Sequence, residues 1–272
     1  MQEFLANPAV QGGVAPLAIA LVLSLGLRPL KLEGLSLVAA FIGSVYLVSG
    51  LDFMPLTSTR KLVVLAIAAP VVGLLVDFAF KPTRIGAAFI AIAAAAGALW
   101  AFWPVLSHKP GNMPWLLGGS AVLALAFLAG FALLRLAEDS VRAGAAALAL
   151  GLGAGICSVL SASVLYGTYG IAVAAGAGGY LLPQMILGRK SQGGASFALT
   201  FAITGGLIAA GAMTLAQLPW YCVLVLALVP IGAILPAPRN APVWLQAVLV
   251  SIYSFIIAGA ACVLAWPSSQ QP

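Results

Sequence analysis

The longest uncharged stretch of the chain is the feature that most limits its fold. Residues 143–188, between Arg142 and Arg189, contain no Asp, Glu, Lys or Arg. A helix needs about 20 apolar residues to cross the hydrocarbon core of a bilayer, so this stretch is long enough for two crossings. Ser161, Ser163 and Gly167 lie near its middle and favour a turn there. We therefore predict a transmembrane hairpin.

The composition extends this interpretation to the whole chain. Hydrophobic residues make up 63% of it and charged residues 7%, against about 25% charged in a soluble domain. So few charges cannot cover a surface that faces water. In lipid, backbone polar groups must be bonded within helices or a closed barrel, and the apolar runs do not alternate as barrel strands do. The predicted fold class is all-α, a polytopic integral membrane helix bundle with a single transmembrane domain over residues 1–272.

About ten transmembrane helices are predicted. The first apolar run is expected to remain as a helix, since no Lys or Arg precedes Arg28 as in a signal peptide. Eight helices remain the alternative, if two segments are re-entrant or interfacial. The hairpin supplies two of the ten segments, and the other eight span residues 14–27, 35–51, 62–80, 85–105, 115–136, 195–215, 220–235 and 243–266.

The basic residues predict the orientation of these helices. Nine lie in loops that follow odd-numbered segments, and three, Arg60, Lys61 and Lys109, in loops that follow even-numbered ones. Cytoplasmic loops carry the excess of Lys and Arg, so both termini are predicted to lie outside, and the location to be a bacterial inner (plasma) membrane. The net charge of +6 is then explained by orientation, and nucleic acid is not an expected partner.

A weak internal repeat is the next prediction. Arg84 and Pro114-Trp115 recur at the same offset as Arg189 and Pro219-Trp220. This pairs residues 84–136 with 189–241, and internal repeats are common in transporters. The alternative is that Arg and Pro-Trp are ordinary residues at membrane boundaries.

Carboxylates are scarce within the predicted spans. Asp77 lies inside one of them, with Lys81 one turn later, so an ion pair between Asp77 and Lys81 near the cytoplasmic boundary is predicted. The alternative is a functional intramembrane acid. No carboxylate is expected near the bilayer centre, which argues against coupling through such a group. Carriers of neutral or anionic solutes, or a passive pathway, remain open.

Residues for catalysis or metal binding are few. His108 is the single histidine, and Cys157, Cys222 and Cys262 are far apart within apolar runs. The cysteines are predicted to be small core residues, with no disulfide framework and no metal site. Phosphate-loop, dinucleotide and zinc-hydrolase motifs are absent from the sequence. We expect neither an enzyme nor a cofactor.

Polar and small residues inside the spans carry the remaining signal. The second helix of the hairpin is rich in glycine and contains a proline, which permits a broken helix that binds a solute. The alternative is close helix packing by glycine. The candidate solute-binding residues are Tyr169, Tyr180, Gln184 and Thr204.

Two functions follow from these patterns. The first is permease-like transport of a small neutral or anionic solute. The second is a non-catalytic structural or accessory subunit, whose partners would be other membrane subunits or further copies of the chain. A cavity near the middle of the membrane would favour transport, and a solid interior would favour the subunit.

Overall fold

The computed structural model describes residues 7–79, 83–238 and 241–266. Within them the chain is helical, with no strand. The helices, joined by short loops, are η1 (Val10–Val14), α2 (Ala15–Gly26), η2 (Arg28–Leu30), α3 (Leu35–Ser49), α4 (Ser58–Phe78), α5 (Arg84–Leu106), α6 (Met113–Phe131), η3 (Ala132–Leu136), α7 (Ser140–Leu160), α8 (Val164–Leu187), α9 (Gly194–Leu215), α10 (Trp220–Ala227), α11 (Val229–Ala233) and α12 (Val243–Ala265).

Seven of the described helices are long and apolar enough to cross a membrane. They are α4, α5, α6 with η3, α7, α8, α9 and α12. The other three predicted segments are also helical but shorter, at Val10–Gly26, Leu35–Ser49 and Trp220–Ala233. The chain is thus an all-helical bundle compatible with a multi-pass membrane protein. Ten crossings stay a prediction.

Local residues explain several helix ends. Thr57 caps α4, since its hydroxyl accepts the backbone N–H of Arg60, and α4 therefore begins four residues before the predicted boundary. The predicted helix 220–235 is divided at Leu228 into α10 and α11. Pro230 follows the division and lacks the N–H that a continuous helix would use.

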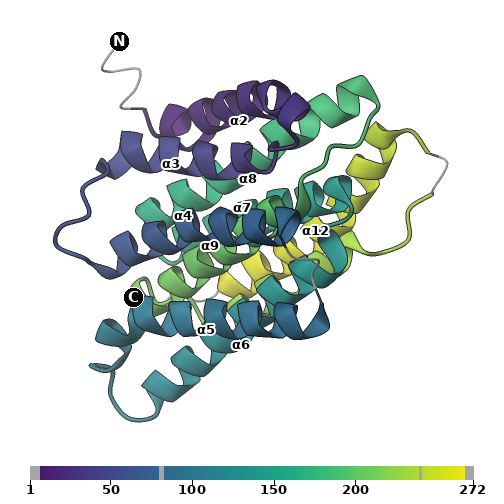
Figure 1. Cartoon of the computed structure of the whole chain (residues 1–272). Helices are drawn as coiled ribbons and strands as arrows, with labels where there is room; N and C mark the ends of the chain where they lie inside the picture. Colours follow the sequence, from purple (N-terminus) through teal and green to yellow (C-terminus); the bar gives the residue numbers. More distant parts are fainter. Residues whose placement is uncertain (1–6, 80–82, 239–240, 267–272) are drawn as a thin grey trace.

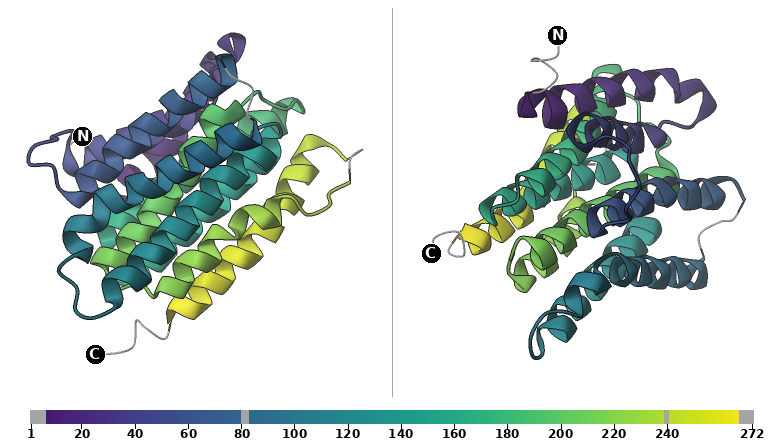
Figure 2. Two further views of the ribbon diagram at one scale, coloured as in Figure 1. Left: turned by 60° about the horizontal axis from the view of Figure 1, so that its bottom comes forward. Right: turned by 90° about the vertical axis from the view of Figure 1, so that its left-hand side faces the viewer.

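The ten helical rods alternate in direction along the chain (Figures 1 and 2). Helices α7, α8 and α9 occupy the centre, with α2 and α3 on one side, α5 and α6 on another and α12 along an edge. The centre is the most buried part: 89% of the apolar window in α9 is buried, against 28% in α12. The start of η1 and the end of α12 lie at the same end of the bundle.

Glycines allow the central helices to approach closely. A Cβ atom added to Gly170 of α8 would lie 2.5 Å from the Cα of Gly155 and 2.8 Å from the carbonyl oxygen of Gly151, both on α7. Likewise, a Cβ on Gly73 of α4 would lie 2.6 Å from the backbone nitrogen of Ser196 on α9. Because α8 continues unbroken through Pro183, its glycines are explained by packing.

Candidate functional site

Asp77 at the end of α4 is bonded to the start of α9. Its carboxylate accepts the backbone N–H groups of Ala195 at 2.6 Å and Ser196 at 2.9 Å. Gly194 has a φ of +60°, a backbone conformation that favours glycine. Asp77 therefore caps α9 from a neighbouring helix. Lys81 lies outside the described residues, and the ion pair between the two stays a prediction.

Tyr169 lies at the opposite end of the bundle, where α3 and α4 meet α8. Its hydroxyl is 3.0 Å from the Ser49 hydroxyl, and its ring makes an edge contact with Phe41. With Asp52 and Thr59, Tyr169 and Ser49 help to line a small cavity of about 100 Å³.

Tyr180 and Gln184 lie together, one turn apart on α8. The Gln184 side-chain oxygen accepts the Ser140 hydroxyl at 2.8 Å and the Ser191 backbone N–H at 3.1 Å. The Tyr180 ring stacks on Phe197 with ring centroids 4.1 Å apart. Its buried hydroxyl has no hydrogen-bond partner, although Ser140, Gln184 and Ser191 surround it.

Thr204 does not join this pair. It is buried in α9 with an unpaired hydroxyl, about 10 Å along the helix from Phe197. Tyr169 is about 16 Å from Tyr180 along α8. Tyr180, Gln184 and Thr204 line none of the described cavities. The structure thus brings two of the four predicted residues together.

The largest described cavity, of about 680 Å³, lies at the end of the bundle where the basic loops gather. Its walls come from the end of η3, the start of α7, the loop after α8, the loop after α11 and the start of α12. We call it the charged cavity. It is lined by Arg135, Glu138, Asp139, Val141, Arg142, Lys190, Ile234, Ala237, Gln246 and Val250.

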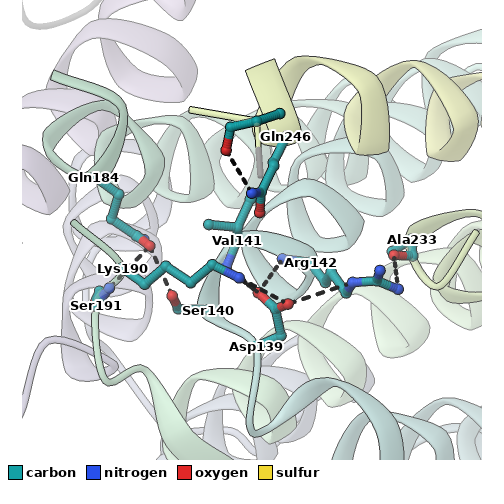
Figure 3. Close-up of polar contacts among 10 residues, drawn as sticks. Asp139, Ser140, Val141, Arg142, Gln184, Lys190, Ser191, Ala233 and Gln246 are labelled. Carbon is teal, nitrogen blue, oxygen red and sulfur yellow. Dashed lines mark hydrogen bonds and ion pairs between the residues drawn. The ribbon is translucent and has the colours of Figure 1, made fainter. Parts of the chain in front are cut away.

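Asp139 organises the charged cavity (Figure 3). One carboxylate oxygen accepts the backbone N–H groups of Val141 and Arg142 and so caps α7. The carboxylate also pairs with Lys190 at 3.2 Å and with the Arg142 side chain at 3.4 Å. Arg142 in turn donates to the Ala233 carbonyl at the end of α11. One carboxylate therefore joins three parts of the chain.

The charge of this cavity favours anions. Arg135, Arg142 and Lys190 face two carboxylates, Glu138 and Asp139, which leaves one positive charge in excess. The N-terminus of α7 adds a partial positive charge. Guanidinium, ammonium and amide groups bind carboxylate and phosphate oxygens. Among the described residues, no group of three or more His, Cys, Asp or Glu could hold a metal ion.

A buried acid, Glu33, lies at the same end of the bundle. Glu33 is 4% exposed and pairs with Arg28 at 3.8 Å. Burial raises the pKa of Glu33, while the nearby Arg28 and a hydrogen bond from the Gln192 backbone lower it. Glu33 thus ties the turn before α3 to the loop after α8.

Gln184 is a candidate from the sequence, whereas the charged residues Asp139 and Lys190, next to its partners Ser140 and Ser191, are not. In the sequence, Arg142 and Lys190 indicate only the orientation of the helices. One available signal was Asp139-Ser140 directly before an apolar run, which is a typical helix N-cap. No local sequence pattern indicates the ion pair between Asp139 and Lys190, because the two residues are far apart in the chain.

Comparison with known proteins adds no family. No protein-family model matches the chain, and no curated protein is significantly similar to it.

Proposed function

We propose that the chain is a permease-like protein of the bacterial inner membrane that carries a small solute, anionic rather than neutral. The observation that carries this proposal is the charged cavity, a space of about 680 Å³ within the size range of small-molecule sites. It opens at the end of the bundle that is proposed to face the cytoplasm, and it serves as the inner entrance for the solute.

The choice of an anion rests on the state of Asp139. Its carboxylate is already neutralised by Lys190 and Arg142, and it occupies the N-terminus of α7. A solute carboxylate or phosphate could compete with it for the same two cations. A cationic solute would meet an excess of positive charge.

The proposed topology has ten crossings and both termini outside. An even number is supported by the start of η1 and the end of α12, which lie at the same end of the bundle; seven crossings would separate them. In this topology the three shorter rods, Val10–Gly26, Leu35–Ser49 and Trp220–Ala233, also cross the membrane. Reporters fused after Arg189 and after Pro272 should therefore lie on opposite faces of the membrane. The same face for both would refute this topology.

Uptake into proteoliposomes tests the transport proposal. The panel should contain small carboxylates, inorganic phosphate and neutral amino acids. We expect uptake of an anion that falls about tenfold or more in Lys190→Gln and Arg142→Gln, since a hydrogen bond to a charged group contributes about 1.5–3 kcal/mol.

Lys109→Gln is the matched control, because it removes a basic residue at the other end of the bundle. It should retain uptake. No uptake of any anion, or an equal loss in Lys109→Gln, would contradict the proposal.

A second candidate is a non-catalytic accessory subunit. It is favoured by the close packing of α7 with α8 and because Tyr180, Gln184 and Thr204 line none of the described cavities. By the criterion of a cavity near the middle of the membrane, these observations favour the subunit, and the transport proposal rests instead on the charged cavity at the end of the bundle. Purification in mild detergent tests it. A defined membrane partner should then co-purify at a fixed ratio, and a chain that always purifies alone would count against this candidate.

A further inference from the structure

Two cysteines that are distant in sequence meet between α7 and α12. The sulfur atoms of Cys157 and Cys262 are 3.7 Å apart. Cys157 is fully buried, whereas Cys262 is partly exposed. The Cys262 sulfur also lies 3.9 Å from the carbonyl oxygen of Gly153 on α7, so its side chain is directed at α7.

The two helix backbones are close at this point. A Cβ atom added to Gly153 would lie 2.9 Å from the Cβ of Ala258 and 3.6 Å from its Cα. Cys157 lies one turn after Gly153, and Cys262 lies one turn after Ala258. Because α7 and α12 run in the same direction, the two cysteines again lie side by side. Disulfides need closely spaced Cα atoms and a sulfur–sulfur bond of about 2.05 Å. The sulfurs must therefore approach by less than about 2 Å.

We propose that Cys157 and Cys262 form a redox-sensitive pair that closes to an intramolecular disulfide between α7 and α12. Both residues lie within one turn of the ends of their helices, at the end of the bundle opposite the charged cavity. In the proposed topology this end is the outer one, where disulfides persist in bacteria.

A small hydroperoxide is the class of oxidant that suits this place. The partly exposed Cys262 thiolate attacks one peroxide oxygen, forming a sulfenic acid and releasing water once the leaving hydroxide takes up a proton. The Cys157 sulfur then attacks the Cys262 sulfur, and the hydroxyl group leaves as a second water with the Cys157 proton. Two thiols and one hydrogen peroxide become one disulfide and two waters.

The bond would tie α12 to the centre of the bundle. At its other end, α12 contributes Gln246 and Val250 to the charged cavity. If solute passage requires α12 to move against α7, the oxidised protein is locked. This consequence depends on the proposed transport function, whereas formation of the disulfide does not.

Thiol counting on the purified full-length protein tests the pair. The reduced protein in detergent is treated with hydrogen peroxide, denatured, alkylated with a maleimide and weighed by mass spectrometry. We expect three labels on the reduced protein and one after oxidation, carried by Cys222. Reduction with dithiothreitol should restore all three, and the oxidised chain should run as a monomer on a non-reducing gel.

Single variants identify the sulfurs. Cys222→Ser should go from two labels to none on oxidation. Cys157→Ser and Cys262→Ser, checked for folding by gel filtration, should lose labels at least tenfold more slowly than the parent. Three labels after oxidation, loss of the label on Cys222, or a disulfide between two chains would each overturn the proposal.

Discussion

Replacing Gly170 by alanine tests the idea that glycine contacts hold the central helices together. Gly170 of α8 lies against the backbone of α7, and a Cβ atom there would be 2.5 Å from the Cα of Gly155. Ordinary van der Waals contact begins at 3.4 Å. The two helices must therefore separate by about 1 Å, since a backbone atom cannot rotate away as a side chain does.

The expected cost follows from this separation. Adding a methyl group to a packed core costs about 1–3 kcal/mol, and a gap of 0.5–1 Å forfeits about a quarter to a half of the attraction between facing atoms. We expect Gly170→Ala to lose about 3 kcal/mol of stability. At about 2–4 °C per kcal/mol for a chain of this size class, its melting temperature should fall by roughly 6–12 °C.

Thermal unfolding in detergent, followed by circular dichroism, measures this effect. Gly119→Ala in α6 is the matched control, because a Cβ there meets nothing within 4 Å. It should be neutral or stabilising by up to about 1 kcal/mol. A Gly170→Ala protein that melts within about 2 °C of the parent, or a Gly119→Ala protein that loses as much, would refute the reasoning.

Three further predictions concern single polar groups. Burial raises the pKa of Glu33 above its usual 4.5, so the folded state holds this proton more tightly, and stability should fall as pH rises between 4.5 and the raised value. Glu33→Gln should flatten that part of the melting profile, and an unchanged slope would contradict the assignment. Asp77→Asn should cost about 1 kcal/mol by weakening the cap of α9, measured by thermal unfolding, whereas Asp52→Asn at the other end should not. Thr204→Val should leave stability unchanged or raise it by about 1 kcal/mol, since its hydroxyl is buried without a partner, and a loss of stability would reveal an unseen bond.

Much of the secondary structure could be predicted because its signals are local. The ten apolar segments are all helical, since long apolar runs and the need to bond the backbone in lipid act within each segment. Pro230, which lacks a backbone N–H, is a further local signal and lies beside the division of the rod 220–235. Even so, the predicted start of α4 at residue 62 is too late. Arg60 and Lys61 resemble loop residues, but Thr57 caps the helix before them.

The candidate site was harder to predict because it depends on tertiary contacts. Lipid-facing and protein-facing surfaces are equally apolar. The sequence of an apolar helix therefore does not indicate which of its faces packs against other helices. Tyr169 and Tyr180 are both polar residues of one helix, yet they lie 11 residues apart, in opposite halves of α8. Asp139 meets Lys190, and Cys157 meets Cys262, only after the central helices have assembled.

The shortness of α3 has a consequence for the surrounding lipid. Its 15 residues span about 22 Å at 1.5 Å per residue, which is less than the roughly 30 Å of a hydrocarbon core. The neighbouring rod Val10–Gly26 is only slightly longer. If both cross, hydrophobic mismatch should thin the bilayer along this flank and leave the opposite flank undistorted. The protein would then favour short-chain lipids beside α2 and α3.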